Sequence, residues 1–458
     1  MMSLKLELAD IYIGLGDHLV SSDARPGARF SRAIIDSRQA QPDDLFFALH
    51  GEHHDAHDFV QAAFAAKAGG AVVSRPVDAP VDRSVFHVRD ALTALQRLAS
   101  YWRSRHNVRL VGVTGSVGKT TAKEIIASLL SHRYQTLKST ANFNTEIGVP
   151  LTLLGLKPEH ERAVLELAMY QPGDIRLLCE ISRPQIGVVL NVHPVHMERA
   201  GSIGRIAAAK AELVESLPTD GLAVLNADDP RVASMVRRTN CRTVTFGLSE
   251  QADVRAEGIT SRGLDGFSFT LKLRGGSSSA IDCRLPGSHH VYAVLAAAAV
   301  ALNEGMTLDE IAVALRSARM DLRLTPRRGR NGSTLIDDSY NASPASMTAA
   351  LDLLSETGGR RIAVLGHMRE LGAAESEGHV AVGRHSVRTS DILVVVGEDA
   401  RLIADSASAA GHSDVRRFDS SEDASANLRD NLKAGDHVLI KASRAVGLEA
   451  LVEALEEA

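Results

Sequence analysis

Apolar residues recur with two different periods along this chain of 458 residues. Between residues 108 and 246, short apolar runs typical of buried strands take turns with segments whose apolar residues recur every three or four positions, as on one face of a helix. The predicted strands are 110–113, 162–167, 185–191, 222–226 and 243–246, and the predicted helices are 122–130, 173–181 and 203–216. This order predicts a mostly parallel sheet covered by helices.

Similar patterns occur on both sides of this block. Before it, the predicted strands are 33–35, 45–49, 70–73 and 85–88, and the predicted helices are 59–67 and 91–103. After it, polar alternation over 252–285 predicts a β extension, which the helices 291–303 and 308–317 follow. The last block has predicted strands at 334–337, 361–365, 392–396 and 437–441, and predicted helices at 344–354, 375–388 and the C-terminus.

The segment Val-Thr-Gly-Ser-Val-Gly-Lys-Thr-Thr at 113–121 lies between a predicted strand and a predicted helix, which is typical of a phosphate-binding loop. Two glycines let backbone N–H groups turn toward phosphate oxygens, the lysine supplies a positive charge, and the first threonine offers a hydroxyl to Mg²⁺. We therefore expect an ATP site formed by Gly115, Ser116, Val117, Gly118, Lys119, Thr120 and Thr121.

Together the blocks predict an α/β protein of three domains, as the chain length also suggests. We expect a small α/β domain at 1–106, a central P-loop ATPase-type domain with a parallel sheet at 107–320, and a Rossmann-like domain at 321–458. The last domain has no Gly-x-Gly-x-x-Gly turn, so the sequence predicts no dinucleotide site there.

A phosphate loop occurs in kinases, GTPases and ligases, so other residues must decide between these classes. Glu166 ends a predicted strand, His196 follows another, and Lys210 lies in a predicted helix. Because the carboxyl ends of parallel strands form the ligand site of such sheets, the carboxylate and the imidazole would bind a second cation beside the phosphates. His193 is an alternative to His196. No hydroxyl-activating Asp motif follows the loop, which argues against a kinase.

Composition argues against several other functions. The net charge of −5 is small and the basic residues are scattered, so we expect neither a nucleic-acid surface nor a polybasic membrane patch. The cysteines Cys179, Cys241 and Cys283 are far apart, which predicts neither a disulfide framework nor a zinc site. The N-terminus lacks a signal-peptide pattern, and the apolar run 291–302 is too short to span a bilayer. We expect a cytoplasmic monomer whose partners are small molecules.

Further motifs accompany the phosphate loop in a fixed order. They are Asn142–Leu151, Glu166, Asn191–His196, Gly201–Ser202, Ala209–Glu212 and Leu225–Asp229. In this order they resemble the Mur ligases of peptidoglycan synthesis. Within that family, Asp337–Ala342, Val364–Gly372 and Lys441–Arg444 are similar to the third domain of the members that add D-alanyl-D-alanine to UDP-N-acetylmuramoyl-tripeptide. Asp36–Arg38 and Pro42–Gly51 resemble the uridine-nucleotide-binding entry domain.

The resemblance implies an amide ligase that uses ATP and Mg²⁺. In this family, ATP phosphorylates the terminal carboxylate of the UDP-muramoyl peptide, and the amine of D-alanyl-D-alanine then displaces the phosphate. Lys119 and a Mg²⁺ ion on Thr120 would neutralise the phosphates. Glu166 and His196 would hold a second Mg²⁺. The lysine that matches Lys210 is carbamylated in the family and ligates this metal, whereas an unmodified Lys210 would pair with a phosphate.

The resemblance also assigns a role to single residues. The expected catalytic residues are Lys119, Glu166, His196 and Lys210. Residues expected near the adenine are Asn226 and Asp229, and those by which the third domain closes over ATP are Arg328, Asp338 and Asn341, with Arg327 as an alternative to Arg328. The expected substrate contacts are Asp36, Ser37, Arg38, Asn144 and Thr145.

Some positions depart from the family pattern. They are His367 in place of an Asp, Ser343 in place of an Asn, Ala442 and Ala168 in place of Gly, and His290 in place of an Asn. None removes a phosphate- or metal-binding group, so they bear on substrate specificity more than on the ATP chemistry. A paralogue that joins another carboxylate and amine is therefore an alternative, and the third residue of the acceptor peptide, diaminopimelate or lysine, stays open. The intact set of charged residues argues against an inactive, nucleotide-responsive regulatory protein.

Overall fold

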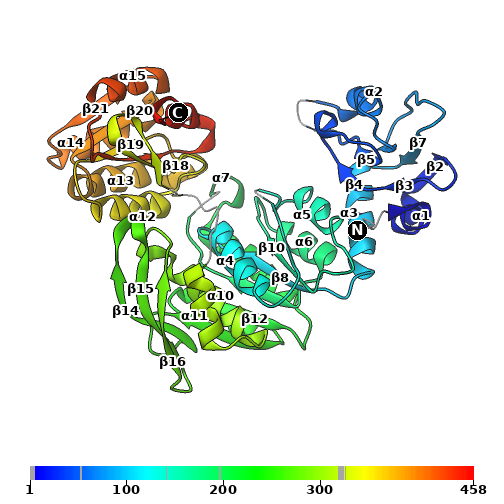
Figure 1. Cartoon of the computed structure of the whole chain (residues 1–458), viewed down its shortest axis with the longest axis horizontal. Coiled ribbons are helices and arrows are strands. Elements are labelled where there is room, and N and C mark those ends of the chain that lie inside the picture. Colours follow the sequence, from blue (N-terminus) through cyan, green and yellow to red (C-terminus); the bar gives the residue numbers. More distant parts are fainter. Residues whose placement is uncertain are drawn as a thin grey trace.

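The structure is a computed structural model that describes residues 6–51, 54–140, 142–194, 197–317, 324 and 326–457. Within these ranges the chain forms an N-terminal, a central and a C-terminal α/β region, each with its own main sheet. Figure 1 shows the N-terminal region, in blue, and the C-terminal region, in orange and red, on opposite sides of the central one. The predicted fold class is confirmed. No helix in the described part of the chain is long and apolar enough to cross a membrane.

The N-terminal region has a sheet in the order β2-β7-β6-β5-β4. Its strands are β2 (Leu19–Asp23), β4 (Arg32–Ile34), β5 (Asp44–Phe47), β6 (Gly70–Val73) and β7 (Ser84–Val88). All but β2 run parallel to their neighbours. Phe46, Phe47 and Phe86 are fully buried between this sheet and its helices. Burial on both faces explains why β5 is an unbroken apolar run in the sequence.

The central region contains a sheet in the order β16-β15-β14-β13-β12-β11-β8-β10-β9. The strands from β8 to β14 run parallel to their neighbours, and β15 and β16 extend the sheet as antiparallel strands. Their bounds are β8 (Arg109–Thr114), β9 (Thr136–Lys138), β10 (Arg162–Glu166), β11 (Ile186–Val189), β12 (Leu222–Asn226), β13 (Arg242–Gly247), β14 (Val254–Ser261), β15 (Phe267–Leu273) and β16 (Ser278–Cys283). The predicted parallel core and β extension are thus both present.

Helices cover both faces of the central sheet. One face packs against α4 (Lys119–Ser131), α10 (Val291–Asn303) and α11 (Leu308–Ser317), and the other against α3 (Ala91–Ser104), α5 (Gly148–Leu153), α6 (Asp174–Ser182) and α8 (Ile203–Glu215). Neighbouring strand residues such as Leu110 and Val111 belong to opposite cores, as the two-residue period of a strand requires. The buried alanines of α10 let this helix lie close to α4.

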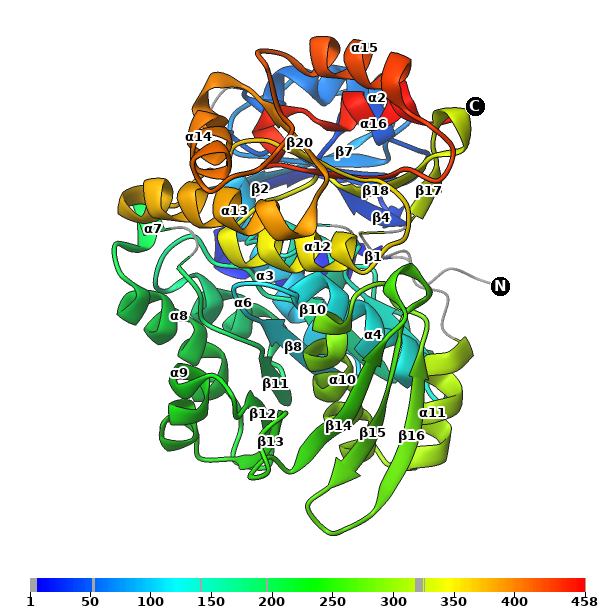
Figure 2. The same cartoon turned by 90° about the vertical axis from the view of Figure 1, so that its left-hand side faces the viewer.

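The C-terminal region has the sheet order β17-β18-β22-β19-β20-β21, with β17 antiparallel to the parallel remainder. Its strands are β17 (Pro326–Arg328), β18 (Thr334–Asp338), β19 (Arg361–Leu365), β20 (Ile392–Val396), β21 (Val415–Phe418) and β22 (His437–Lys441). Its helices are α12 (Pro344–Ser355), α13 (Glu375–Thr389), α14 (Arg401–Ala409), α15 (Ser421–Asn431) and α16 (Glu449–Leu455). Figure 2 shows α12 and α13 on the side that faces the central region.

The predicted boundary at residues 106 and 107 lies just after α3, where Arg103 is buried. The Arg103 guanidinium donates hydrogen bonds to the carbonyl oxygens of Ser182 (3.0 Å), His106 (3.1 Å) and Val108 (3.0 Å). These bonds fix the end of α3 to α6 and to the start of β8. The boundary between 320 and 321 lies outside the described residues, and both domain limits stay predictions.

We expect Arg103→Ala to lower the free energy of unfolding by about 2–4 kcal/mol, because it leaves three buried carbonyl oxygens without a donor. Urea unfolding followed by the fluorescence of the single tryptophan, Trp102, measures this loss. Arg105→Ala is the matched control, because the Arg105 side chain is 59% exposed, and it should change the stability by less than about 1 kcal/mol. Equal effects of the two variants would contradict this role of Arg103.

Candidate active site

The phosphate loop joins β8 to α4, as the sequence predicts. Gly118 has φ +82°, a left-handed conformation that a residue with a side chain rarely adopts, and α4 begins directly after it. A Cβ atom on Gly115 would come within 2.9 Å of the Leu190 Cβ atom. The first glycine therefore allows contact with the end of β11, and the second makes the turn into the helix.

The residues after β11 hold the phosphate loop. Asn191 Oδ1 accepts hydrogen bonds from the backbone N–H groups of Ser116 (3.0 Å) and Val117 (2.9 Å), and its Nδ2 donates to the Val117 carbonyl oxygen (3.0 Å). The Ser116 hydroxyl donates to the His193 carbonyl oxygen (3.0 Å) and accepts from the His193 backbone N–H (2.8 Å). Our residue assignments missed Asn191, although a polar residue at the carboxyl end of a parallel strand was a usable signal.

The Lys119 side chain lies against the same loop. Its ammonium group donates hydrogen bonds to the carbonyl oxygens of Gly115 (3.0 Å) and Ser116 (3.3 Å). This position keeps a positive charge at the mouth of the loop, where we expect the phosphates of ATP to bind.

Glu166 is buried at the end of β10, with 3% of its surface exposed. Its carboxylate accepts hydrogen bonds from the Thr120 hydroxyl (2.8 Å) and from Asn144 Nδ2 (2.8 Å). The structure thus brings together Thr120, Asn144 and Glu166 from α4, β10 and the loop before α5. Among the described residues, no lysine or arginine forms an ion pair with Glu166. A buried carboxylate without a cationic partner is costly, so a bound cation would stabilise it.

Lys210 comes from α8 and is almost fully buried. Burial, and secondly the positive charge of Lys119, lower the pKa of Lys210 well below its usual range. Because the charge of Lys119 affects this pKa, the two ammonium groups lie near each other. Lys210 therefore loses its proton at a much lower pH than an ordinary lysine does.

Of the two histidines considered as metal ligands, only His193 lies in the part of the chain that the structure describes. His196 lies outside the described residues. His193 follows β11, and burial lowers its pKa, with Asp229 acting in the opposite direction and Arg231 and Lys210 in the same one. His193 is therefore close to the charged site, and the choice between the two histidines stays a prediction.

The oxygen ligands beside the phosphate loop fit Mg²⁺. Mg²⁺ prefers hydroxyl and carboxylate oxygens, and in phosphate sites it is held by one or two carboxylates together with water and phosphate oxygens. The Thr120 hydroxyl and the Glu166 carboxylate, 2.8 Å apart, offer such a donor pair. Within the described ranges no three His, Cys, Asp or Glu side chains gather as a metal-binding group. Phosphate oxygens and water would therefore contribute to the coordination.

Asn226 and Asp229 act on the segment that holds the phosphate loop. Asn226 Nδ2 donates to the Leu190 carbonyl oxygen (2.8 Å), and Asp229 Oδ2 accepts from the Val192 backbone N–H (2.7 Å). Asp229 also caps α9 (Pro230–Ala233) through its other oxygen. Both side chains thus have structural partners on either side of Asn191, and their contact with adenine stays a prediction.

Of the residues expected to close over ATP, Asp338 and Asn341 lie near each other, whereas Arg328 does not. The ammonium group of buried Lys441 forms an ion pair with Asp338 and donates to the Asn341 carbonyl oxygen (2.8 Å). Arg328 pairs in register with Thr334 at the other end of β18, roughly 13 Å away along the strand. Arg327 is bound to Asp337 and Glu456. Lys441 is thus the cation beside Asp338, and our residue assignments missed it.

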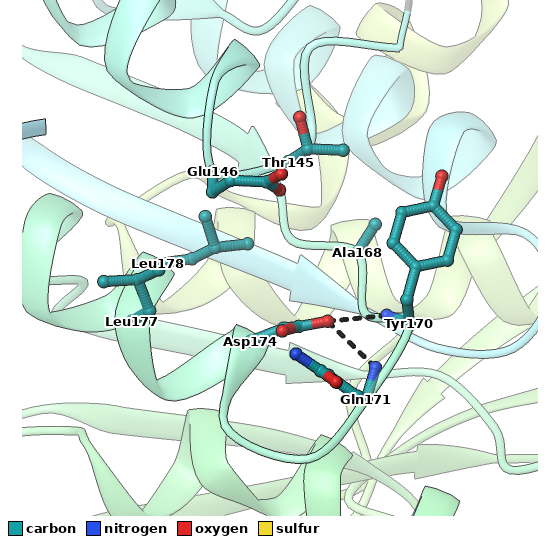
Figure 3. A pocket seen from close by; sticks show the side chains of 8 residues that line it. All are labelled: Thr145, Glu146, Ala168, Tyr170, Gln171, Asp174, Leu177 and Leu178. Atoms are coloured by element: carbon teal, nitrogen blue, oxygen red, sulfur yellow. Dashed lines mark hydrogen bonds between the residues drawn. The ribbon is translucent and has the colours of Figure 1, made fainter. Parts of the chain in front are cut away.

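A cavity of about 340 Å³ opens beside Asn144. Figure 3 shows the side chains of its lining, which are Thr145, Glu146, Ala168, Tyr170, Gln171, Asp174, Leu177 and Leu178. The Asp174 carboxylate accepts hydrogen bonds from the backbone N–H groups of Tyr170 (2.8 Å) and Gln171 (2.9 Å). The backbone N–H of Ala168 donates to the Asn144 carbonyl oxygen (2.9 Å). The cavity therefore borders the loop that holds Glu166, and Thr145, an expected substrate contact, lines it.

The remaining expected substrate contacts lie in the N-terminal region. Asp36 caps the 3₁₀ turn Ser37–Gln39, and the Arg38 guanidinium binds the Asp36 carboxylate at 2.9 and 2.8 Å. The Arg38 side chain is 87% exposed. Their contact with a uridine nucleotide stays a prediction.

Comparison with known proteins identifies the family. The model of the Mur ligase middle domain matches residues 113–301, and that of the Mur ligase, glutamate ligase domain matches residues 319–444. A UDP-N-acetylmuramoyl-tripeptide--D-alanyl-D-alanine ligase of Synechocystis sp. is 37% identical over 99% of this chain and 98% of its own length. The chain belongs to the Mur ligase family.

Solved structures of Mur ligases agree over the whole chain. MurF from Acinetobacter baumannii matches with a TM-score of 0.88 and 30% identity, over 99% of both chains. The MurF ligase from Thermotoga maritima in complex with ADP matches with a TM-score of 0.80 and 30% identity, over 92% of this chain and 96% of that one. The resemblance stated from the motifs is thus confirmed.

Two departures from the Mur ligase pattern have local structural explanations. Ser343 is the N-cap of α12, where its hydroxyl accepts from the Ser346 backbone N–H, and Pro344 occupies the first helical position. Serine is as good an N-cap as the asparagine it replaces. His290 packs against His289, with ring centroids 4.1 Å apart, and burial lowers the pKa of both histidines, that of His289 to about 4. Both rings are therefore neutral at pH 7.

We expect Asn191→Ala to weaken nucleotide binding about 10- to 100-fold, because the Val117 N–H loses its acceptor and the Ser116 N–H keeps only the backbone carbonyl oxygen of residue 191. Titration calorimetry with ADP and Mg²⁺ measures the dissociation constant. Asn303→Ala is the matched control, since Asn303 only donates to Ala299 within α10. An unchanged dissociation constant in Asn191→Ala would show that the loop keeps its shape without this side chain.

Proposed function

We propose that this chain is an ATP-dependent ligase that adds D-alanyl-D-alanine to UDP-N-acetylmuramoyl-tripeptide in the synthesis of peptidoglycan precursors. The carrying observation is the charge arrangement around one loop: Lys119 lies on the phosphate loop, buried Lys210 lies close enough to feel its charge, and Thr120 donates to the buried Glu166 carboxylate. The Synechocystis relative, named for this reaction and similar from end to end, supports the choice of substrates.

The proposed reaction has two steps. The carboxylate of the tripeptide attacks the γ-phosphorus of ATP, so that an acyl phosphate forms and ADP leaves. The amine of D-alanyl-D-alanine then attacks the acyl carbon, phosphate leaves with the bonding electrons, and the amine loses a proton. Both anions repel each other before the first step, so the site must supply positive charge. Lys119 supplies it at the loop, and the complex of the Thermotoga relative with ADP supports a nucleotide there.

Mg²⁺ is the second source of positive charge in this proposal. Thr120 and Glu166 would hold it, with His196 or His193 and a modified Lys210 as further ligands. When bound, Mg²⁺ would draw phosphate and carboxylate oxygens together. The low pKa of Lys210 supports carbamylation, because a neutral amine can add to CO₂, and the product is an anion that ligates a metal.

The cavity beside Asn144 is the proposed seat of the third residue of the peptide. The reacting carboxylate belongs to this residue, so its side chain must lie within a few ångströms of Glu166. Thr145 and Ala168, which line the cavity, adjoin the Asn144 and Glu166 segments. Its charged lining residues are Glu146 and Asp174, and Asp174 already accepts two backbone N–H groups. Glu146 is thus the residue proposed to bind the distal ammonium that lysine and diaminopimelate share.

Phosphate release from ATP tests the function. We expect release only when the UDP-muramoyl-tripeptide and D-alanyl-D-alanine are both present, and formation of the pentapeptide in equal amount. Lys119→Ala should lower kcat by at least about a hundredfold while the thermal unfolding temperature stays the same, because it removes a phosphate contact and no core volume. Wild-type turnover in Lys119→Ala, or phosphate release without either substrate, would refute the proposal.

Acceptor peptides with different third residues test the cavity. We expect Glu146→Gln to raise KM about three- to tenfold for UDP-muramoyl-tripeptides that end in lysine or diaminopimelate, with little change in kcat. For a peptide that ends in Nε-acetyl-lysine, which has no charge to lose, the two proteins should have equal KM. Glu159→Gln, a change at an exposed glutamate outside the cavity, is the matched control. A uniform effect on all three peptides would contradict recognition of the ammonium.

A further inference from the structure

His367, which departs from the Mur ligase pattern, lies in a pair of stacked imidazoles. Its ring centroid is 4.7 Å from that of His379, and the planes differ by 26°. His367 Nδ1 lies 3.0 Å from the Asp399 carbonyl oxygen, and its Nε2 lies 3.7 Å from the Glu375 carboxylate. His367 is thus committed to contacts inside the C-terminal region.

The partners of His379 determine which of its ring nitrogens carries the proton. The backbone N–H of Met368 donates to His379 Nε2 at 3.1 Å, so this nitrogen is unprotonated. His379 Nδ1 lies 2.8 Å from the Glu375 carbonyl oxygen, to which it donates its proton. Only the neutral imidazole can make both hydrogen bonds. The ring is buried, with 1% of the residue exposed.

His379 thereby anchors the loop between β19 and α13, residues 366–372, which we call the β19 loop. Ser443 is the second anchor, since its hydroxyl accepts from the Arg369 backbone N–H (2.9 Å) and its backbone N–H donates to the His367 carbonyl oxygen (3.0 Å). Within this loop Glu370 has φ +65°, which is uncommon for a residue with a side chain. Two anchors thus hold a loop with a strained backbone.

The β19 loop contacts the central region. The Glu370 carbonyl oxygen accepts a hydrogen bond from the backbone N–H of Met197 (3.0 Å), the first residue of α7 (Met197–Ala200). A Cβ atom on Gly372 would lie 3.4 Å from the Glu198 backbone nitrogen, so the two backbones are close. α7 contacts the 3₁₀ turn Gly372–Ala374 that precedes α13, and Figure 2 shows α7 just below α13. The strained residue is thus one of those that touch the other region.

The same stretch of the central region reaches the phosphate loop. Asn191 and His193 bind Ser116 and Val117, and Met197 lies a few residues further along the chain. Asn191 and His193 thus contact the phosphate loop, and Met197 contacts the β19 loop.

We propose that His379 is a positioning residue that sets where the C-terminal region docks beside the phosphate loop, and that it does so only as a neutral imidazole. This inference rests on the proposed function, together with the expectation from the Mur ligase resemblance that the third domain closes over ATP and binds the amine. A protonated His379 has no acceptor for the Met368 N–H, so the β19 loop loses one anchor and the contact between Glu370 and Met197 weakens.

The surroundings of His379 set the sign of the pH dependence. The titratable groups that face it are His367 from the β19 loop, Asp399 from the 3₁₀ turn Glu398–Ala400 and Glu375 from α13 itself. Burial has the largest effect and lowers its pKa, and His367 acts in the same direction, whereas Glu375 and Asp399 oppose it. The neutral form therefore dominates at pH 7, and docking should weaken as the pH falls below the ordinary histidine value of about 6.5.

Hydrogen–deuterium exchange of the full-length protein tests the anchor, together with steady-state kinetics. We expect His379→Ala to lower the protection factor of residues 366–372 about tenfold and to raise KM for D-alanyl-D-alanine by a similar factor, with a smaller effect on kcat. His379→Gln keeps an acceptor for Met368 and should restore both values. In the wild type, the protection factor should fall and KM should rise as the pH is lowered. In His379→Gln neither value should show this pH dependence.

His412→Ala is the matched control. His412 is in the same region and burial lowers its pKa too, but it binds Ser390 and the Asp414 backbone, away from the β19 loop. Equal protection of the loop in His379→Ala and His412→Ala would overturn the inference. A pH dependence in His379→Gln equal to that of the wild type would also overturn it. This second comparison decides the question if His379→Ala does not fold. Absence of ligase turnover in the wild type would refute the proposed function alone, because the exchange measurements do not depend on turnover.

Discussion

The repulsion between two anions is the constraint on which the rest of this structure depends. A triphosphate and a carboxylate meet only where positive charge replaces the water that would otherwise screen them. Lys119 on the phosphate loop supplies positive charge. Glu166, a buried carboxylate that has only neutral donors as partners in the described part of the chain, would hold Mg²⁺ as a second source, and buried Lys210 would do so once modified. Burial makes each of these charges more effective, and it also makes each more costly to leave unpaired.

The parallel sheet lets residues far apart in sequence share one site. The loops after β8, β10, β11 and β12 all leave the same edge of the central sheet. Asn191, Asn226 and Asp229 then bind the neighbouring loops rather than solvent, so the phosphate loop is supported from the side as well as from its own helix. Met197, a few residues after Asn191 in the chain, contacts the C-terminal region through the Glu370 carbonyl oxygen.

Much of the fold follows from local patterns. The predicted strands 70–73, 222–226, 361–365, 392–396 and 437–441 agree with the structure residue for residue, because strands buried on both faces are unbroken apolar runs. Elements with few buried residues were not predicted, among them α15 (Ser421–Asn431), whose polar sequence buries only Ala424, Ser425 and Leu428. The edge strand β2 (Leu19–Asp23) is largely exposed and was missed for the same reason.

The sequence by itself determined the parallel α/β class, the phosphate loop and the family, because each depends on residues that are close together in the chain or on motifs in a fixed order. Only the tertiary structure decided that Asn191 holds the loop, that Lys441 neutralises Asp338 and that Arg328 lies at the far end of β18 from it. It also placed His367 in an imidazole pair, while the bearing of this residue on substrate specificity stays a prediction. Such pairs depend on strand order and register, and these are set by packing between segments that no local pattern connects.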